Sequence, residues 1–229
     1  MGPDISAISL FLKGCNFKCP YCINNRLIDF EIDRPLLKFD DIKDILSESK
    51  WVMISGGEPT CHPMKDLIDL IEKIKSLGCK VGMATNGYNI DKIRALMKYL
   101  NYMALDFKIY DAHKYESLLI DEFRIDYEYV LSTVIHVAYL LRHHSLDESH
   151  DFDYEVRTTM YRPMIDQNSL RSIAMLLPPN TKWVWQKFRP VKNMPLEESK
   201  DILPYDETEI IKMMESVKTI QNNICYRYI

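Results

Sequence analysis

The stretch Lys13-Gly14-Cys15-Asn16-Phe17-Lys18-Cys19-Pro20-Tyr21-Cys22 places three cysteines in one short loop, at C-x3-C-x2-C spacing. It directly follows an apolar run, residues 8–12. Three thiolates so close together are the ligands expected for an iron–sulfur cluster or for zinc. A [4Fe–4S] cluster ordinarily takes four cysteines, so three would leave one iron with an open position for chemistry. A zinc knuckle that lacks one ligand is the alternative that the loop leaves open.

A second motif, Ser55-Gly56-Gly57-Glu58-Pro59-Thr60, ends the next apolar run at residues 51–54. Glycines at such a point let the backbone approach a ligand closely. A plain strand-to-helix turn is the alternative explanation of this stretch.

Together the cysteine loop, with Tyr21 before its third cysteine, and the glycine-rich motif resemble the radical S-adenosylmethionine (SAM) superfamily over almost the whole chain. The resemblance implies a [4Fe–4S] cluster on Cys15, Cys19 and Cys22. It also implies that SAM binds the open iron, with its amino group held by the backbone of Gly56 and Gly57 and by the Glu58 carboxylate. An electron from the cluster then breaks SAM into methionine and a 5′-deoxyadenosyl radical.

Strands and helices are predicted to alternate along the chain. The expected strands are residues 5–12, 51–54, 80–84, 102–108, 154–160 and 182–187, with a short final strand at 224–228. The expected helices are residues 38–49, 64–77, 91–100, 127–142, 167–177 and 206–221, with a polar loop at 142–150. Alternation of this kind predicts a parallel sheet, and six units are too few for a closed eight-stranded barrel. We therefore expect an α/β fold, an open (β/α)6 partial TIM barrel, as one domain over residues 1–229.

Polar residues follow the later strands, at the edge where parallel α/β folds bind ligands. The resemblance implies that Asn86, Asp106 and Lys108 hold the ribose and carboxylate of SAM. An ion pair between Asp106 and Lys108 alone is the equally simple alternative. Arg157 on the fifth strand is expected to meet the SAM carboxylate or the substrate, although a buried structural arginine fits as well.

Gln186-Lys187-Phe188-Arg189-Pro190 follows the sixth strand, where members of the superfamily contact adenine. We accordingly expect Gln186 and Phe188 to bind the cofactor.

The other cysteines and the histidines are given no metal. Cys61, Cys79 and Cys225 are scattered along the chain, and a lone cysteine is usually a small buried hydrophobe. His62 is expected to be a turn residue. The group His143, His144 and His150 fits no known ligand spacing and is expected to lie in a solvated loop.

Composition and sequence patterns limit the partners and the cellular compartment that the chain is compatible with. The formal net charge of −4 speaks against a nucleic-acid partner. No apolar run is long enough for a membrane span, and the first residues lack a signal-peptide pattern. We therefore expect the cysteines to be reduced in the cytosol of an anaerobic organism, with a reductant such as flavodoxin or ferredoxin as partner.

Two substrates are compatible with the resemblance. Residues 156–159 and 186–190 resemble the activating proteins of anaerobic ribonucleotide reductases, whose partner is a large glycyl radical protein. Those activases usually open with a Ser-x-x-Asp-x-Pro-Gly-like segment, which residues 1–6 do not match. We therefore expect a small-molecule enzyme instead, with the related queuine lyases, which release 7-aminomethyl-7-deazaguanine from queuine, as the named candidate. The activase is the alternative.

A planar 7-deazaguanine base would need a slot with flat walls and a few polar groups at the barrel mouth. The candidates for these contacts are Asn24, Asp106, Glu155, Arg157, Gln186, Phe188, Arg189 and Tyr228. A third class, an electron carrier or zinc scaffold, would leave Gly56-Gly57-Glu58 without a role.

Overall fold

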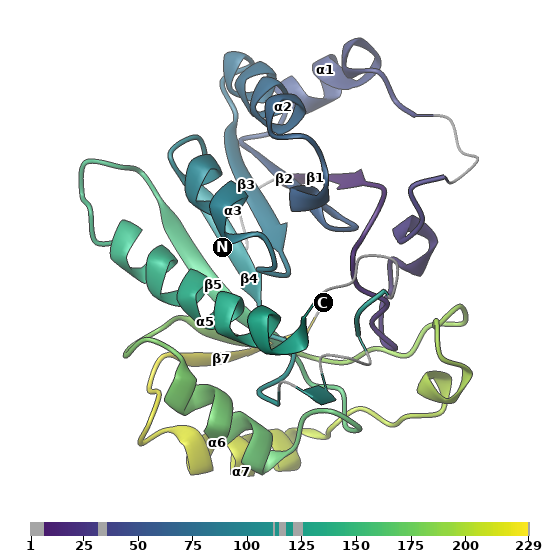
Figure 1. Ribbon diagram of the computed structural model, residues 1–229, viewed down its shortest axis with the longest axis vertical. Helices are drawn as coiled ribbons and strands as arrows, with labels where there is room; N and C mark the ends of the chain where they lie inside the picture. The colour runs from purple at the N-terminus through teal and green to yellow at the C-terminus, as the bar shows by residue number, and fades with distance from the viewer. Residues whose placement is uncertain (1–6, 32–35, 112, 115–117, 121–125, 229) are drawn as a thin grey trace.

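A single curved parallel sheet organises the molecule (Figure 1). The computed structural model describes residues 7–31, 36–111, 113–114, 118–120 and 126–228. Within these ranges seven strands pair in sequence order, each parallel to the next. They are β1 (Ala7–Leu12), β2 (Trp51–Gly56), β3 (Lys80–Thr85), β4 (Tyr102–Asp106), β5 (Asp153–Thr159), β6 (Trp183–Gln186) and β7 (Ile224–Arg227).

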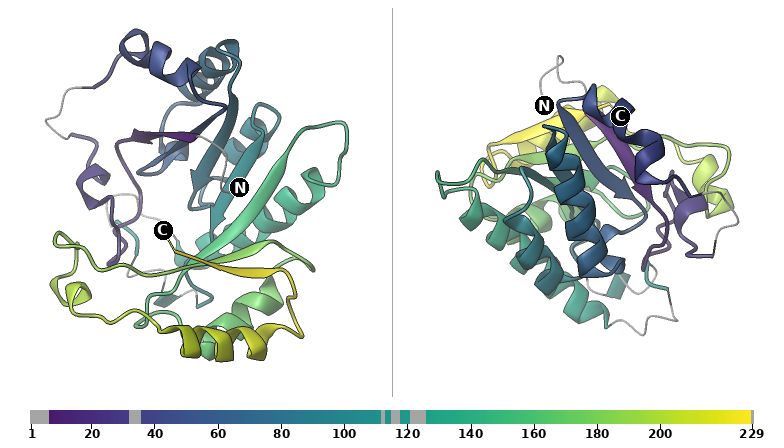
Figure 2. Two further views of the ribbon diagram at one scale, coloured as in Figure 1. Left: turned by 180° about the vertical axis from the view of Figure 1, so that it is seen from behind. Right: turned by 90° about the horizontal axis from the view of Figure 1, so that it is seen from above.

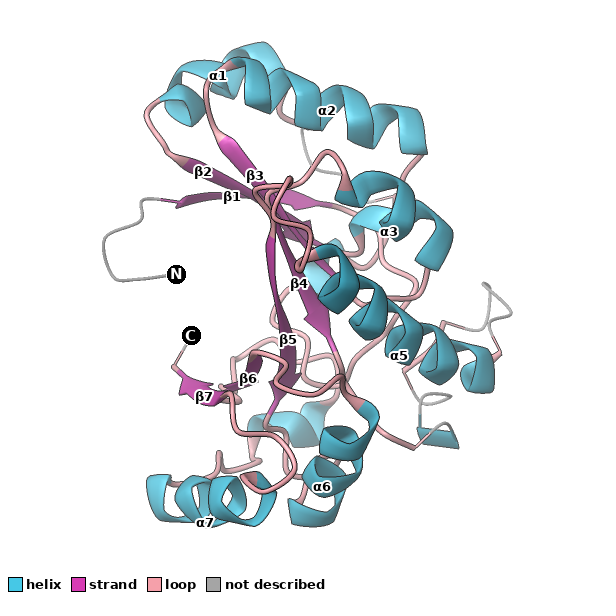
Figure 3. Cartoon of the chain, turned by 90° about the vertical axis from the view of Figure 1, so that its left-hand side faces the viewer, coloured by secondary structure: helices cyan, strands magenta, loops and turns pink. Residues whose placement is uncertain are grey.

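Helices follow the strands and lie on the outer face of the sheet, as the views from behind and from the side show (Figures 2 and 3). They are α1 (Phe39–Ser47), α2 (Met64–Ser76), α3 (Ile90–Met97), α5 (Tyr127–His144), α6 (Gln167–Leu176) and α7 (Glu207–Val217). Short 3-10 turns occur at η1 (Asn25–Leu27), η2 (Pro59–Cys61) and η4 (Glu197–Lys200). No helix among the described residues is both long and apolar enough to cross a membrane.

The main core lies between the sheet and these helices. On α2 the apolar spacing puts Leu67, Ile71 and Ile74 on one face, and all three are fully buried against the sheet. Burial of each such side chain contributes about 1.5–3 kcal/mol to folding. Gly78 then ends the helix segment with a positive φ of 84°, which a residue with a side chain adopts only with strain.

The predicted open (β/α)6 architecture is confirmed, with small differences at its edges. The last strand pairs with β6 and joins the sheet as a seventh member. The strand expected over 102–108 ends at Asp106, so Lys108 lies just beyond it. The helix expected to end at residue 142 continues to His144, so the polar loop begins later than predicted. Asp206 is the N-cap of α7, and its capping-box partner is Glu209.

The sheet does not close into a barrel. Its two end strands, β1 and β7, pair with one neighbour each within the described residues. Among the described residues, no helix covers the inner face of the curved sheet between them (Figure 3). The inward-facing residues Ala7, Ser9 and Phe11 of β1 are accordingly exposed. The carboxyl ends of the strands therefore surround a space that is open along one side.

Candidate functional site

A cavity of about 320 Å³ lies at the carboxyl ends of the strands. Its walls come from the cysteine loop and from the ends of β1 to β6. All the residues predicted to bind the cluster or the cofactor line this cavity: Cys15, Cys19, Cys22, Gly56, Gly57, Glu58, Asn86, Asp106, Lys108, Arg157, Gln186 and Phe188. Residues distant in sequence are thus gathered at one edge because every strand of the sheet runs in the same direction.

The cysteine loop is shaped by backbone contacts with the segment that follows it. Gly14 N–H donates to the Leu27 carbonyl (2.6 Å) and Cys15 N–H donates to the Ile28 carbonyl (2.9 Å). Gly14 has a φ of +87°, and the Phe30 ring occupies the position that a Cβ would need. These contacts hold the loop in place independently of any ligand.

The glycine-rich turn after β2 packs directly on the cysteine loop. Gly57 N–H donates to the Leu12 carbonyl (2.7 Å), and Glu58 N–H donates to the Gly14 carbonyl (2.8 Å). A Cβ on Gly57 would overlap the Gly14 carbonyl oxygen, so only glycine permits this approach. His62, predicted as a turn residue, caps η2 and adds a contact from its Nε2 to the Lys13 carbonyl (2.8 Å). The two motifs are therefore one structural unit.

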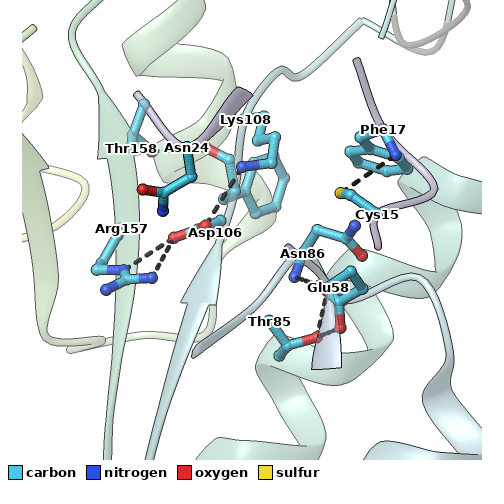
Figure 4. Close-up of polar contacts among 12 residues, drawn as sticks. Cys15, Phe17, Asn24, Glu58, Thr85, Asn86, Asp106, Lys108, Arg157 and Thr158 are labelled. Carbon is cyan, nitrogen blue, oxygen red and sulfur yellow. Dashed lines mark hydrogen bonds and ion pairs between the residues drawn. The ribbon is translucent and has the colours of Figure 1, made fainter. Parts of the chain in front are cut away.

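The Glu58 carboxylate is the centre of a buried hydrogen-bond network, drawn in Figure 4. Its side chain is 1% exposed. Oε1 accepts from Thr60 N–H (3.0 Å), Thr60 Oγ1 (2.7 Å) and Thr85 Oγ1 (2.8 Å), and Oε2 accepts from Asn86 N–H (2.6 Å). Burial raises the pKa of Glu58, while these four donors act in the opposite direction. The carboxylate thus ties the turn after β2 to the end of β3.

Asn16, which was not among the predicted site residues, extends this network into the cysteine loop. Its Oδ1 accepts from Asn86 Nδ2 (2.8 Å), and the residue is fully buried. Its Nδ2 has no hydrogen-bond partner among the described residues. A buried donor without a partner is costly, so this amide suits a site that a bound group completes. The sequence feature that could have indicated this role is the position of Asn16 directly after Cys15.

Three charged side chains form a second group on the opposite wall of the cavity (Figure 4). Asp106 Oδ1 accepts from Arg157 Nε (2.8 Å) and pairs with Arg157 Nη2 (2.7 Å), while Asp106 Oδ2 pairs with Lys108 Nζ (3.2 Å). Burial alone would raise the pKa of Asp106, but the two cations outweigh it and lower that pKa. The simple pairing of Asp106 with Lys108 is present, and Arg157 joins it. The group carries one more positive than negative charge.

Burial and one nearby cation act in opposite directions on the pKa of the three loop thiols. Burial raises the pKa of Cys15 and Cys22, and raises the pKa of Cys19 to about 11, although nearby Lys108 opposes the shift at each. Free thiols here would be protonated, whereas metal coordination removes the proton outright.

The donor set also discriminates between metals. Within the described parts of the chain no three Cys, His, Asp or Glu side chains converge tightly enough for one metal ion. Zinc would need ligands at about 2.0–2.3 Å from one point. In a [4Fe–4S] cluster each thiolate binds a different iron, and three cysteines that line one cavity suit such a cluster.

The remaining candidates are divided between the cavity and other places. Asn24 and Arg189 line the cavity, and Asn24 Nδ2 donates to the Gly56 carbonyl (3.3 Å). Glu155 does not line it, and its carboxylate accepts two hydrogen bonds from Arg227, at 2.8 and 2.9 Å. Tyr228 also lies outside the lining, beneath Lys187.

The cysteines and histidines outside the loop have ordinary surroundings. Cys79 is buried, as expected of a small hydrophobe, whereas Cys225 is exposed and does not fit that expectation. The His144 ring packs on Phe152, with ring centres 4.7 Å apart, so it is more than a solvated loop residue.

Comparison with known proteins agrees with this site. The Radical SAM superfamily model matches residues 9–141. A Methanocaldococcus jannaschii protein provisionally named glycyl-radical enzyme activating enzyme MJ1227 is 29% identical, over 99% of this chain and 91% of its own. The pyruvate formate-lyase-activating enzyme of Clostridium pasteurianum is 29% identical over 51% of each chain. The 7-carboxy-7-deazaguanine synthase of Hyperthermus butylicus is 35% identical over 38% of this chain and 37% of its own.

Solved structures show the same fold. Streptococcus suis SuiB, bound to the precursor peptide SuiA, superimposes with a TM-score of 0.64 at 16% identity, over 96% of this chain and about half (48%) of SuiB. TYW1 with a lysine-pyruvate adduct superimposes with a TM-score of 0.61 at 15% identity, over 93% of this chain and 73% of TYW1. Family match, fold and cysteine geometry agree, and this chain therefore belongs to the radical SAM superfamily, whose enzymes use a [4Fe–4S] cluster and S-adenosylmethionine.

Proposed function

We propose that this protein is an activating enzyme that creates a glycyl radical in a partner protein. The observation that carries the proposal is the similarity to the M. jannaschii protein named as an activating enzyme, since it spans nearly the full length of both chains. Shorter matches, such as that to the deazaguanine synthase, cover little more than a third of the chain. A similarity confined to part of the fold says less about what the whole site acts on.

The open side of the sheet supports this proposal. A glycine within a protein reaches the cavity only if a stretch of its own chain enters with it. The cavity is bordered by β1, at one end of the sheet, and its Phe11 side chain is 56% exposed. An uncovered inner face next to the cysteines gives such a segment room.

The residues have distinct proposed roles. Cys15, Cys19 and Cys22 would hold the cluster, which would supply the electron for reductive cleavage of SAM and so for removal of a hydrogen atom from the glycine Cα. A low-potential reductant such as flavodoxin or ferredoxin restores that electron. Residues of this chain orient SAM. The amino group of SAM is proposed to bind the turn at Gly56, Gly57 and Glu58.

The other SAM contacts are assigned to the remaining walls. Lys108 and Arg157 carry the excess positive charge that suits a carboxylate, with Asp106 fixing both side chains. Asn86 lies beside Glu58 for the ribose, and Gln186 and Phe188 are assigned to the adenine.

A small-molecule substrate is the second candidate. It rests on the 35% identity to the deazaguanine synthase and on the several polar groups that line the cavity. The sequence analysis above favoured queuine cleavage because residues 1–6 do not match the opening segment of the activases. Those residues lie outside the described part of the chain, and no other observation supports queuine as the substrate. The activase is therefore the better-supported proposal.

The deciding experiment uses anaerobically reconstituted, reduced protein with SAM. It is incubated with an anaerobic ribonucleotide reductase and, separately, with queuine. We expect a glycyl radical signal by electron paramagnetic resonance, one 5′-deoxyadenosine per radical, and intact queuine. Turnover of queuine without any glycyl radical would overturn the proposal in favour of the lyase.

A further inference from the structure

The cysteine loop contains a buried amide with incomplete hydrogen bonding. Asn16 is 0% exposed, and its Oδ1 accepts a hydrogen bond from Asn86 Nδ2 at 2.8 Å. The Nδ2 of Asn16 carries two protons, and neither finds an acceptor within the described parts of the chain. An unpaired buried donor is costly, and folded proteins keep few of them. This amide therefore calls for an acceptor that the chain itself does not supply.

The neighbouring contacts fix the direction in which the Asn16 amide points. Asn86 Oδ1 accepts from the Tyr88 N–H (3.0 Å), and a backbone N–H can only donate. The Nδ2 of Asn86 therefore faces Asn16, and the atom of Asn16 that meets it must be the acceptor, Oδ1. Turning the Asn16 amide over would set two donors against each other. The unpaired Nδ2 thus follows from the network itself.

Asn16 lies between two residues that line the cavity, Cys15 and Phe17. The Phe17 N–H donates to Cys15 Sγ at 3.3 Å, so one donor of this segment already serves a sulfur atom (Figure 4). No sulfur of the described residues accepts from Asn16 Nδ2. A [4Fe–4S] cluster bound to the loop would bring further sulfur atoms, its sulfides, to the same segment. Such sulfurs are known acceptors of N–H hydrogen bonds.

We propose that Asn16 joins the two halves of the site: its Oδ1 holds Asn86 on the side assigned to SAM, and its Nδ2 donates to a sulfur of the bound cluster. An N–H···S hydrogen bond favours the reduced cluster, which carries one more negative charge, and so raises the reduction potential. The proposal goes beyond the activating function and applies to either substrate class, because both need the same cluster.

Isotope labelling tests the donor directly. The full chain is made with the heavy nitrogen isotope only in the side-chain amide of asparagine, reconstituted anaerobically and reduced without SAM. Pulsed electron paramagnetic resonance of the reduced cluster should show a coupling to the labelled nitrogen. Asn16→Leu should abolish this coupling. Asn25→Leu is the matched control, because the Asn25 amide donates to the Asn193 carbonyl outside the cavity lining, and it should keep the coupling.

The reduction potential is the second readout. Without the donor, the reduced form of the cluster in Asn16→Leu should be disfavoured roughly tenfold, which for a one-electron couple is a shift of about 59 mV to more negative potential. Asn25→Leu should keep the wild-type value. Both variants are compared in anaerobic redox titrations at equal iron content.

Asn16→Asp separates the two ends of the amide. The carboxylate keeps an acceptor for Asn86 Nδ2 but offers no donor to the cluster. Its affinity for SAM should stay within about twofold of the wild type, whereas Asn16→Leu, which loses the acceptor as well, should bind SAM roughly tenfold more weakly in anaerobic titration. A merely structural role would lower SAM affinity equally in both variants.

The outcomes decide in both directions. No nitrogen coupling in the wild type, a coupling that survives in Asn16→Leu, or an unchanged potential overturns the donor to the cluster. Equal loss of SAM affinity in Asn16→Asp and Asn16→Leu overturns the link to Asn86. If Asn16→Leu does not retain iron, the smaller change Asn16→Ser takes its place in each comparison. None of these results bears on glycyl radical formation, so the proposed function is tested separately.

Discussion

Gly57 shows how one missing side chain joins the two motifs. A methyl group there would overlap the Gly14 carbonyl, so Gly57→Ala must push the turn away from the cysteine loop. We expect this variant to take up much less iron on anaerobic reconstitution, measured by iron and sulfide analysis. Gly78→Ala is the control: a Cβ there meets nothing within 4 Å, and its φ of +84° should cost about 1 kcal/mol of stability without loss of iron. Normal iron content in Gly57→Ala would show that the loop tolerates the displacement.

Glu58 is expected to act on SAM rather than on iron. Glu58→Ala removes the acceptor for four buried donors, two of which belong to the end of β3. The SAM-binding turn should therefore loosen, with roughly tenfold weaker SAM binding in anaerobic titration and an intact cluster absorbance spectrum. Glu72→Ala, on the exposed side of α2, should change neither. Loss of the cluster in Glu58→Ala would instead assign the residue to the cysteine loop.

At the scale of elements, the last strand is tied to the sheet by a partly buried charge pair. Arg227 of β7 reaches past β6 to Glu155 of β5, whose side chain is 2% exposed. Arg227→Met leaves that carboxylate without its cation and should lower the free energy of unfolding by about 2–4 kcal/mol, with the 39% exposure of Arg227 limiting the loss. The double variant Arg227→Met/Glu155→Gln should recover much of the lost free energy of unfolding, measured by denaturant titration. If Arg227→Met were as stable as the wild type, the pair would position β7 without contributing to stability.

The same pair predicts how stability depends on pH. Burial would raise the pKa of Glu155, but hydrogen bonds from Arg227 and Tyr102 outweigh it and lower the pKa below the ordinary 4.5. As the pH falls, the Glu155 carboxylate is thus protonated in the unfolded chain before it is protonated in the folded protein. The stabilisation is present above pH 4.5 and is lost as the pH drops through the folded pKa. Glu155→Gln should therefore lose less stability than the wild type on acidification, measured by thermal unfolding of both proteins at matched pH values.

Across the whole molecule, fold and cluster are expected to be separable. We propose that residues 1–229 form one domain, because one sheet and one main core run through the described chain. Its strands are held by the sheet and helices, and the cysteine loop by backbone bonds to residues 27 and 28. Cys19→Ser should thus lose its iron yet keep the wild-type far-ultraviolet circular dichroism.

Cys61→Ala is the matched control for that variant, because Cys61 lies outside the cavity lining, on η2. It should keep its iron. Retained iron in Cys19→Ser, or lost iron in Cys61→Ala, would contradict the assignment of the cluster ligands.

The sequence alone determined the elements and the identity of the site. Apolar spacing predicted each strand and the helices between them, because burial of one face is a local property of the pattern. The cysteine spacing and the glycine-rich motif marked the cavity, since parallel strands deliver both to the same edge.

Only the tertiary structure decided which side chains meet. That Glu58 would be enclosed by Thr85 and Asn86, that Glu155 would pair with Arg227, and that Asn16 would keep a donor without a partner depend on strand order and register. The same holds for the open side between β1 and β7. Long-range contacts of this kind follow from the packing of the whole sheet, and no local pattern in the chain records them.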